Sequence, residues 1–207
     1  MKVGGVELLL PELADPVAYI TDRMERSRRG EADLPYWTKL WPAALVLAQF
    51  AASLPARDDR PWLELGAGLG LPGLAAAAAG RQVVLSDLDP DALEFARAAV
   101  EINHLEQRVQ VRSLDWTDPA SELGSFGTVL GAEILYHPPL YDQLVDLMDR
   151  LVASDGTIFL SHEQRPFLIG FFNRAQERYR IRRTSRTLRS DGDETRVFLY
   201  ALTKNLN

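Results

Sequence analysis

The sequence predicts an α/β fold with a seven-stranded, mostly parallel sheet, helices on both faces and a C-terminal antiparallel hairpin. Short apolar segments of β type alternate with longer helical patterns, as expected when helices connect parallel strands. One of these strands runs directly into a glycine-rich loop. Near the C-terminus, two strand-like segments follow each other with only turn-forming residues between them, which predicts the hairpin.

The composition is that of an ordinary globular domain. Of 207 residues, 46% are apolar and 25% are charged, which suits one domain with a sizeable core. The net charge of −6 does not favour binding of nucleic acid or an anionic membrane by the molecule as a whole. The lack of cysteine excludes disulfides and thiolate metal sites and fits a cytoplasmic location. The three scattered histidines show no metal-ligand spacing, so no metal is expected.

Residues 1–40 are predicted to form an N-terminal extension that packs on the core, and residues 41–207 form the α/β domain. The extension should contain a helix at Pro16–Arg28 and a loop from Gly30 to Pro35. Its first apolar run is too short for a secretory signal. The uncharged stretch Leu40–Ala56 is interpreted as a core helix, because two prolines and polar residues interrupt it as a membrane span.

The strands are predicted where β-type apolar segments are short and bounded by turn residues. Five form the parallel core: Trp62–Leu65, Gln82–Ser86, Val109–Arg112, Thr128–Ala132 and Thr157–Ser161. The hairpin strands, Tyr179–Arg183 and Arg196–Thr203, lie on either side of the turn-forming segment Ser190–Asp193.

The helices are predicted from their start signals and from apolar spacing of period 3.6. The best marked begins at Asp89-Pro90, where an N-cap residue precedes proline at the first helical position. Others are expected at Leu74–Ala79, after Pro138-Pro139 and at Phe167–Arg178.

The glycine-rich loop follows the first core strand, with glycines at alternate positions, Gly66, Gly68 and Gly70. Glycine permits a tight turn and lets a ligand approach the backbone closely. With Gly73, the last two also match the G-x-G-x-x-G spacing of dinucleotide-binding proteins, so a nicotinamide-dependent oxidoreductase is an alternative.

Two further residues favour a different ligand. Glu64 lies in the strand end, where an anion is badly placed for a pyrophosphate but can hold a cationic or hydroxyl-bearing ligand. Pro72 lacks the backbone N–H that a phosphate-binding turn would use.

Acidic residues follow the next two strands. Asp87, twenty-one residues after Gly66, is placed to accept hydrogen bonds from ribose hydroxyls; the alternative is a local turn cap. Asp89 is interpreted as the cap of the following helix. After the third strand, Asp115 can accept a bond from an adenine amino group and Trp116 can supply a stacking wall; a core tryptophan is the alternative.

The motif E-x-G-x-G-x-G, Asp87, the Leu114–Trp116 turn and the segment Glu133–Tyr136 together resemble class I S-adenosylmethionine-dependent methyltransferases with a Rossmann-like domain. More narrowly, they resemble the seven-strand protein-lysine methyltransferases of methyltransferase family 16. The resemblance runs from about Leu34 to Thr203. The Pro35-Tyr36-Trp37 and Trp41-Pro42 segments are similar to those of members that act on the electron-transfer flavoprotein β subunit.

This resemblance implies S-adenosyl-L-methionine as cofactor, S-adenosyl-L-homocysteine as product and a protein lysine as acceptor. It implies catalytic roles for Glu133 and Tyr136, and substrate contacts for Tyr36 and Trp37. Family members carry aspartate where Glu133 stands, so the longer side chain places its carboxylate about one bond length away. The implied cofactor-binding residues are Trp41, Glu64, Gly66, Ala67, Gly68, Gly70, Asp87, Leu88, Asp115, Trp116 and Ala132.

Other acceptors remain open at this point, because the same cofactor site serves a small-molecule amine, another metabolite or RNA. A non-catalytic binding protein that keeps the loop as a scaffold is a further alternative.

Seven arginines fall between Arg174 and Arg189, offset only by Glu177. Either this segment docks an acidic partner surface or RNA, or it is a solvated outer strand whose charges prevent edge pairing.

Overall fold

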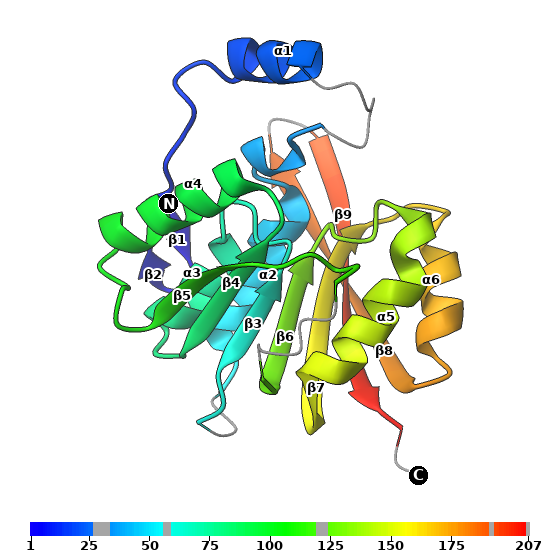
Figure 1. The fold of residues 1–207 in the computed structure, drawn as a ribbon. Helices are drawn as coiled ribbons and strands as arrows, with labels where there is room; N and C mark the ends of the chain where they lie inside the picture. Colours follow the sequence, from blue (N-terminus) through cyan, green and yellow to red (C-terminus); the bar gives the residue numbers. More distant parts are fainter. Residues whose placement is uncertain (27–33, 56–58, 119–123, 191–192, 206–207) are drawn as a thin grey trace.

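A computed structural model describes residues 1–26, 34–55, 59–118, 124–190 and 193–205. Its main sheet has seven strands in the order β5-β4-β3-β6-β7-β9-β8 (Figure 1). The first five in this order are parallel, β9 is antiparallel to β7, and β8 is antiparallel to β9. The predicted fold class is therefore confirmed. The strands are β3 Trp62–Leu65, β4 Val83–Asp87, β5 Val109–Ser113, β6 Phe126–Ala132, β7 Val152–Glu163, β8 Tyr179–Ser190 and β9 Asp193–Lys204.

Helices cover both faces of the sheet. On one face lie α2 (Pro42–Ser53), α3 (Leu71–Ala78) and α4 (Pro90–Ile102), whose apolar side chains join β3 and β4 in one core cluster. On the other face, α5 (Tyr141–Leu151) and α6 (Leu168–Ala175) pack on β6, β7 and β9. The uncharged stretch forms α2, with five residues buried. In the part of the chain that the structure describes, no helix combines the length and apolarity needed to cross a bilayer.

Several helix boundaries follow the predicted signals. Asp89 caps α4, since its side chain accepts hydrogen bonds from the N–H groups of Asp91 and Ala92. Pro138 and Pro139 form a single 3-10 turn with Leu140, η3 (Pro138–Leu140), and α5 begins at the next residue. The proline pair thus initiates a turn, and α5 buries Leu144, Leu147, Met148 and Leu151.

The C-terminal region differs from the prediction in extent. Strands β8 and β9 have 12 residues each and pair in continuous register from Tyr179↔Lys204 to Ser190↔Asp193. Apart from Leu188, the distal half of β8 consists of arginine, serine and threonine, and this polar sequence gives no continuous apolar signal, although backbone pairing to β9 continues. Helix α6 ends at Ala175, three residues before the predicted end. Residues 191 and 192 of the predicted turn lie outside the described residues.

The N-terminal part contains a small two-stranded sheet, β1 (Lys2–Val3) and β2 (Val6–Glu7), which the sequence did not predict. Helix α1 (Pro16–Arg26) buries none of its residues and lies outside both helical layers (Figure 1). A 3-10 turn, η2 (Tyr36–Thr38), lies shortly before α2 in the sequence. Residues 27–33, which include the end of the predicted helix and most of the predicted loop, lie outside the described residues.

Candidate functional site

A cavity of about 380 Å³ lies at the carboxyl ends of β3, β4 and β6. Strand β3 is flanked by β4 on one side and β6 on the other, so the chain reverses its direction of winding here. Open α/β sheets bind ligands at such a switch point, and this volume suits a small organic ligand. All the sequence-predicted site residues line the cavity: Tyr36, Trp37, Trp41, Glu64, Gly66, Ala67, Gly68, Gly70, Asp87, Leu88, Asp115, Trp116, Ala132, Glu133 and Tyr136.

The glycine loop connects β3 to α3 by a backbone path that other residues rarely adopt. Gly66, Gly68 and Gly70 have φ values of 58°, 53° and 72°. These values lie in the left-handed region, where a Cβ is unfavourable. The N–H of Ala67 donates to the carbonyl of Ser86 at 2.9 Å and ties the loop to β4. The alternate glycines therefore have a conformational cause that is independent of any ligand.

Asp87, the last residue of β4, connects its strand to the glycine loop. Its Oδ2 accepts a 2.8 Å hydrogen bond from the N–H of Gly68, and its Oδ1 accepts a 3.0 Å bond from the N–H of Asp89. Burial raises the pKa of Asp87 despite these donors. The carboxylate is thus fixed in position at the cavity wall.

Glu64 lies on β3 beneath the loop and is only 1% exposed. Its Oε2 accepts a 2.7 Å hydrogen bond from the N–H of Gly73, and burial raises the pKa of Glu64 to about 8. A Cβ on residue 73 would lie 2.3 Å from a methyl of Leu85 and 2.7 Å from Oε2 of Glu64. Gly73 is therefore required for close helix–strand packing, and its N–H is hydrogen-bonded to the Glu64 carboxyl group.

Asp115 and Trp116 lie where β5 ends, beside the loop. The N–H and hydroxyl of Thr117 donate to Oδ1 of Asp115 at 2.8 and 2.7 Å, which lowers the pKa of Asp115. A Cβ on Gly66 would lie 3.3 Å from the Trp116 ring, so the indole borders the loop directly. Trp116 also packs partly against the core cluster around α5, so its ring contributes both to the cavity wall and to the core.

Aromatic side chains form the opposite rim of the cavity. The rings of Tyr36 and Tyr136 lie 5.4 Å apart between centroids, and Tyr36 also contacts Trp41 at 6.4 Å. The indole N–H of Trp41 donates to the Tyr36 carbonyl at 2.9 Å and fixes the turn before α2. Tyr36 and Tyr136 are 41% and 53% exposed. This pair is therefore accessible from solvent.

Trp37 lies next to Tyr36 in sequence but points into the protein. Its ring is 8% exposed and lies 4.9 Å from that of Phe95 on α4. Its indole N–H donates to Asp89 at 3.1 Å. These are the contacts of a packing residue that holds η2 to α4, and a substrate contact by Trp37 stays a prediction.

Glu133 follows β6 with an unusual backbone, at φ 53°. Its Oε1 accepts a 2.7 Å hydrogen bond from the N–H of Glu163, while Oε2 lies 3.3 Å from Nδ1 of His162 and 3.7 Å from Nε of Arg165. Burial favours a raised pKa, but His162, the Glu163 N–H and Arg165 outweigh it, so the pKa of Glu133 is lowered. The side chain is therefore an ionised carboxylate anchored to β7.

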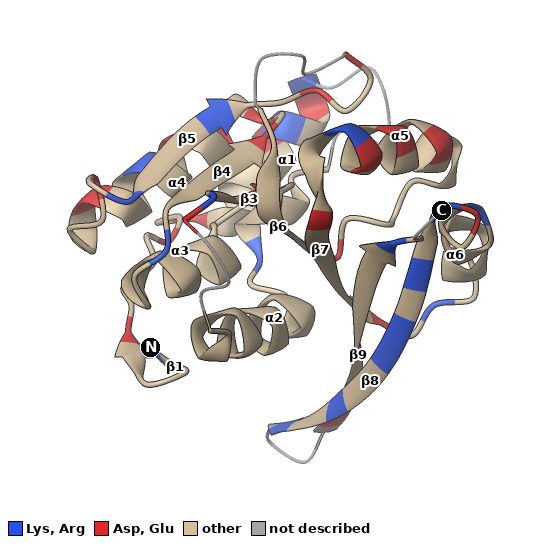
Figure 2. Ribbon diagram, turned by 90° about the horizontal axis from the view of Figure 1, so that it is seen from below, with Lys and Arg blue, Asp and Glu red and all other residues tan. Residues whose placement is uncertain are grey.

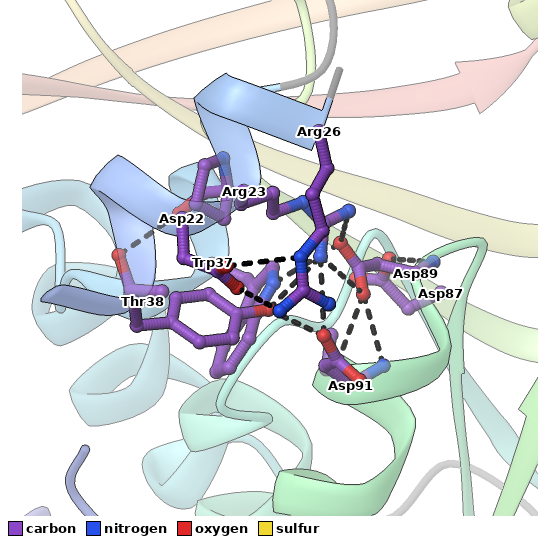
Figure 3. Close-up of polar contacts among 11 residues, drawn as sticks. Asp22, Arg23, Arg26, Trp37, Thr38, Asp87, Asp89 and Asp91 are labelled. Carbon is purple, nitrogen blue, oxygen red and sulfur yellow. Dashed lines mark hydrogen bonds and ion pairs between the residues drawn. The ribbon is translucent and has the colours of Figure 1, made fainter. Parts of the chain in front are cut away.

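The sequence indicated no partner for Glu133, since His162 lies 29 residues away. It likewise missed a cluster between α1 and the start of α4, shown in Figure 3. Arg23 lies 2.6 Å from Asp89 and 3.2 Å from Asp91, and it donates to the hydroxyl of Tyr19 at 2.9 Å. Arg23 also lines the cavity. These contacts hold α1 against the cavity mouth, and no local pattern in the sequence signals them.

The open sheet, the glycine loop at its switch point and the carboxyl groups at neighbouring strand ends define a domain of the class I methyltransferase type. The sequence matches the family model of methyltransferase family 16, described as lysine methyltransferase, over residues 34–182. The chain belongs to this family.

Curated relatives carry related names. Protein N-lysine methyltransferase METTL21A of Xenopus tropicalis is 35% identical over 130 residues, covering 61% of this chain and 60% of the relative. EEF1A lysine methyltransferase 3 of Mus musculus is also 35% identical over 130 residues, covering 61% of this chain and 56% of the relative. Histone-arginine methyltransferase METTL23 of Mus musculus is 34% identical over 119 residues, covering 53% and 46%. The chain spans about 60% or less of the length of these relatives.

Solved structures show the same fold at low sequence identity. Precorrin-6y C5,15-methyltransferase from Geobacter metallireducens superposes with a TM-score of 0.65 at 15% identity, covering 78% of this chain and 89% of that chain. A tRNA (uracil-54, C5)-methyltransferase from Pyrococcus abyssi, in complex with S-adenosyl-L-homocysteine, gives 0.57 at 21% identity, covering 77% and 38%.

Proposed function

We propose that this protein is an S-adenosyl-L-methionine-dependent methyltransferase whose acceptor is the side-chain amine of a lysine in a protein. The observation that carries this proposal is the cavity in which the Gly66–Gly70 loop, Asp87 and the Tyr36–Tyr136 pair meet. Membership in the lysine methyltransferase family supports the choice of acceptor. The lack of cysteine suits a reducing compartment, and we propose the cytoplasm.

The residues of the cavity suit S-adenosylmethionine. Asp87 presents a fixed carboxylate for ribose hydroxyls, and Asp115, held through one oxygen by Thr117, can accept from an adenine amino group. Leu88 is 61% exposed at the cavity wall and, with Trp116, offers apolar surface to a base. Below the loop, the buried carboxyl of Glu64 can balance a cationic ligand once it is ionised.

When bound, S-adenosylmethionine supplies a methyl group on a positively charged sulfur, so the leaving group needs no acid catalyst. The protein then has to orient a deprotonated amine, because a lysine side chain has an ordinary pKa of about 10.4. We assign the holding of this amine by hydrogen bonds to Glu133 and the Tyr136 hydroxyl, whose residues both line the cavity. The lowered pKa of Glu133 makes it a weak base. We therefore assign Glu133 the orientation of the amine, and solvent takes up the proton that the lysine ammonium loses. Such positioning contributes about 7–11 kcal/mol in favourable cases.

The exposed rim favours a macromolecular acceptor over a metabolite. Tyr36 and Tyr136 border the cavity from the solvent side with about half of their surfaces free. A small metabolite would gain more from an enclosed pocket that buries most of its surface.

The test is incubation of the purified protein with methyl-tritiated S-adenosylmethionine and a cell extract, followed by protease or nuclease treatment and acid hydrolysis. Label in protease-sensitive material that elutes as methyl-lysine supports the proposal. Recovery as methylarginine would show that the acceptor is arginine and not lysine, in line with the named activity of the METTL23 relative. Label only in nuclease-sensitive material or in small molecules would contradict a protein acceptor.

A further inference from the structure

The arginines of the C-terminal hairpin divide between the two faces of the sheet. Because side chains alternate along a strand, Arg180, Arg182 and Arg186 share one face of β8. Arg183 and Arg196 occupy the other face, and each guanidinium stacks over the Phe198 ring, at 5.1 and 5.0 Å. The arginines of this second face therefore have partners within the hairpin.

Among the residues that the structure describes, the arginines of the first face have no such partner. Arg180, Arg182 and Arg186 are exposed, and within the described residues no carboxylate lies in ion-pairing distance of them. Their row lies on the face that carries α2, because Leu188, two residues after Arg186, packs against the cluster that Val197 of β9 forms with Ala43 and Val46 of that helix. The twelve residues of α2 include no charged side chain. Figure 2 shows the basic residues as separate bands along β8, at the edge of the sheet.

This row leads to the acceptor side of the cavity. Arg186 pairs with Val197, which pairs with Glu163, and the N–H of Glu163 binds the Glu133 carboxylate. Two strand spacings, about 10 Å, thus separate the backbone of Arg186 from that of Glu163. The cluster that Val197 and Leu188 share with α2 includes Ala43 in the first turn of that helix, and Trp41 immediately precedes the helix.

We propose that Arg180, Arg182 and Arg186 form a docking surface for an acidic segment of the acceptor protein, with Arg186 at the end of the row nearest the cavity that the lysine enters. The proposal rests on the proposed function for the identity of the occupant. A local row of unpaired cations on a protein of net charge −6 selects an oppositely charged partner and orients its approach. Most of the hairpin lies beyond the family match, which ends at Arg182, so it can distinguish the acceptor of this chain from those of its relatives.

The competing explanation is that these charges only prevent edge-to-edge pairing of β8 with another sheet. That role needs charge on the edge strand but no ligand. It predicts that charge removal increases self-association and leaves the binding of acidic segments unchanged.

The experiment compares three proteins: wild type, the double variant Arg182→Glu/Arg186→Glu, and the control Arg97→Glu/Arg150→Glu. The control makes the same change in net charge at exposed positions of α4 and α5. The probe is a fluorescent twenty-residue peptide of aspartate and glutamate with one central lysine, and its binding is measured by anisotropy at low salt. We expect the hairpin variant to bind about tenfold more weakly than wild type, and the control to bind like wild type.

Equal affinity in all three proteins, or no binding by wild type, would overturn the proposal. So would tighter binding of a single-stranded RNA of equal length that the hairpin variant loses, because the surface would then serve nucleic acid. Thermal unfolding and S-adenosylhomocysteine affinity of each variant report its folding, and Arg182→Gln/Arg186→Gln replaces a reversal variant that does not fold. Failure of wild type to bind S-adenosylhomocysteine would instead remove the proposed function and leave the peptide result to be judged separately.

Discussion

The backbone N–H of Gly68 donates a 2.8 Å hydrogen bond to Oδ2 of Asp87, which joins the glycine loop after β3 to the end of β4. Gly68 can donate in this direction because its φ of 53° turns the loop back toward the neighbouring strand. The same carboxylate accepts from the N–H of Asp89 at the start of α4. One side chain thus positions the two backbone segments that face the cavity.

Close packing of α3 on β3 and β4 predicts a cost for any side chain at residue 73. Gly73→Ala should lower the free energy of unfolding by about 1–3 kcal/mol, because the new methyl would overlap Leu85 and Glu64. Gly170→Ala is the matched control: its Cβ would lie 3.5 Å from Tyr141 inside helix α6, an ordinary contact. Alanine there should be neutral or stabilising by up to about 1 kcal/mol. Urea unfolding measures both, and equal stability of the two variants would contradict this packing.

The buried Glu64 predicts a pH-dependent stability. Its pKa is about 8 in the folded protein against an ordinary 4.5, so between these values the folded state holds a proton that the unfolded chain has released. Stability should therefore fall as the pH rises from 5 to 8, on the order of a few kcal/mol from this group. Glu64→Gln should flatten the curve, whereas Glu94→Gln, at an exposed position on α4, should not. Parallel curves for wild type and Glu64→Gln would show that Glu64 titrates normally.

The Arg23 contacts predict that α1 is held mainly by polar interactions, since it buries none of its residues and its aromatic contact is the edge-to-face pair of Tyr19 with Trp37. Arg23→Ala should speed amide hydrogen exchange in α1 about tenfold, because charge-assisted hydrogen bonds to Asp89 and Asp91 are lost. Arg26→Ala, which removes only an exposed pair with Asp22 within the helix, should have a much smaller effect. Deuterium uptake in α1, measured by mass spectrometry, distinguishes the two variants. Identical uptake in Arg23→Ala and Arg26→Ala would exclude Arg23 as the residue that holds α1 to the rest of the protein.

Glu133 is predicted to orient the acceptor. Glu133→Gln keeps an oxygen that can accept from the Glu163 N–H but removes the charge beside His162 and Arg165. We expect kcat for methyl transfer to fall about 10- to 100-fold, with unchanged affinity for S-adenosylhomocysteine. Initial rates with the acceptor identified by radiolabelling measure this. Full activity in the variant would reduce Glu133 to a structural anchor of β7.

Local sequence signals were sufficient for the glycine loop and for the strand ends that surround it. Alternate glycines after a short apolar strand, and an aspartate at the end of the next strand, express constraints that act within a few residues. The parallel order of the strands then brings Gly66, Asp87, Asp115 and Glu133 to one edge. That part of the site is therefore predictable from the sequence alone.

Contacts between distant segments could not be predicted in this way. Arg23 and Asp89 lie 66 residues apart, and Glu133 and His162 lie 29 apart. No periodicity links them, because their meeting depends on how α1 and β7 are placed by the rest of the fold. The buried orientation of Trp37 is similar: its neighbour Tyr36 faces solvent, and contacts with the distant residues Phe95 and Asp89 explain the difference.

The most direct test of the central claim is isothermal titration of wild type and Asp87→Ala with S-adenosylhomocysteine, with NAD and NADP as comparison ligands. The account predicts micromolar binding of S-adenosylhomocysteine to wild type, loss of at least about tenfold in affinity in the variant, and no heat from either nicotinamide nucleotide. Circular dichroism of the variant should match wild type, so that the loss reports the site and not the fold. Binding of NAD or NADP in place of S-adenosylhomocysteine, or an unchanged affinity in Asp87→Ala, would contradict the proposed use of this cavity.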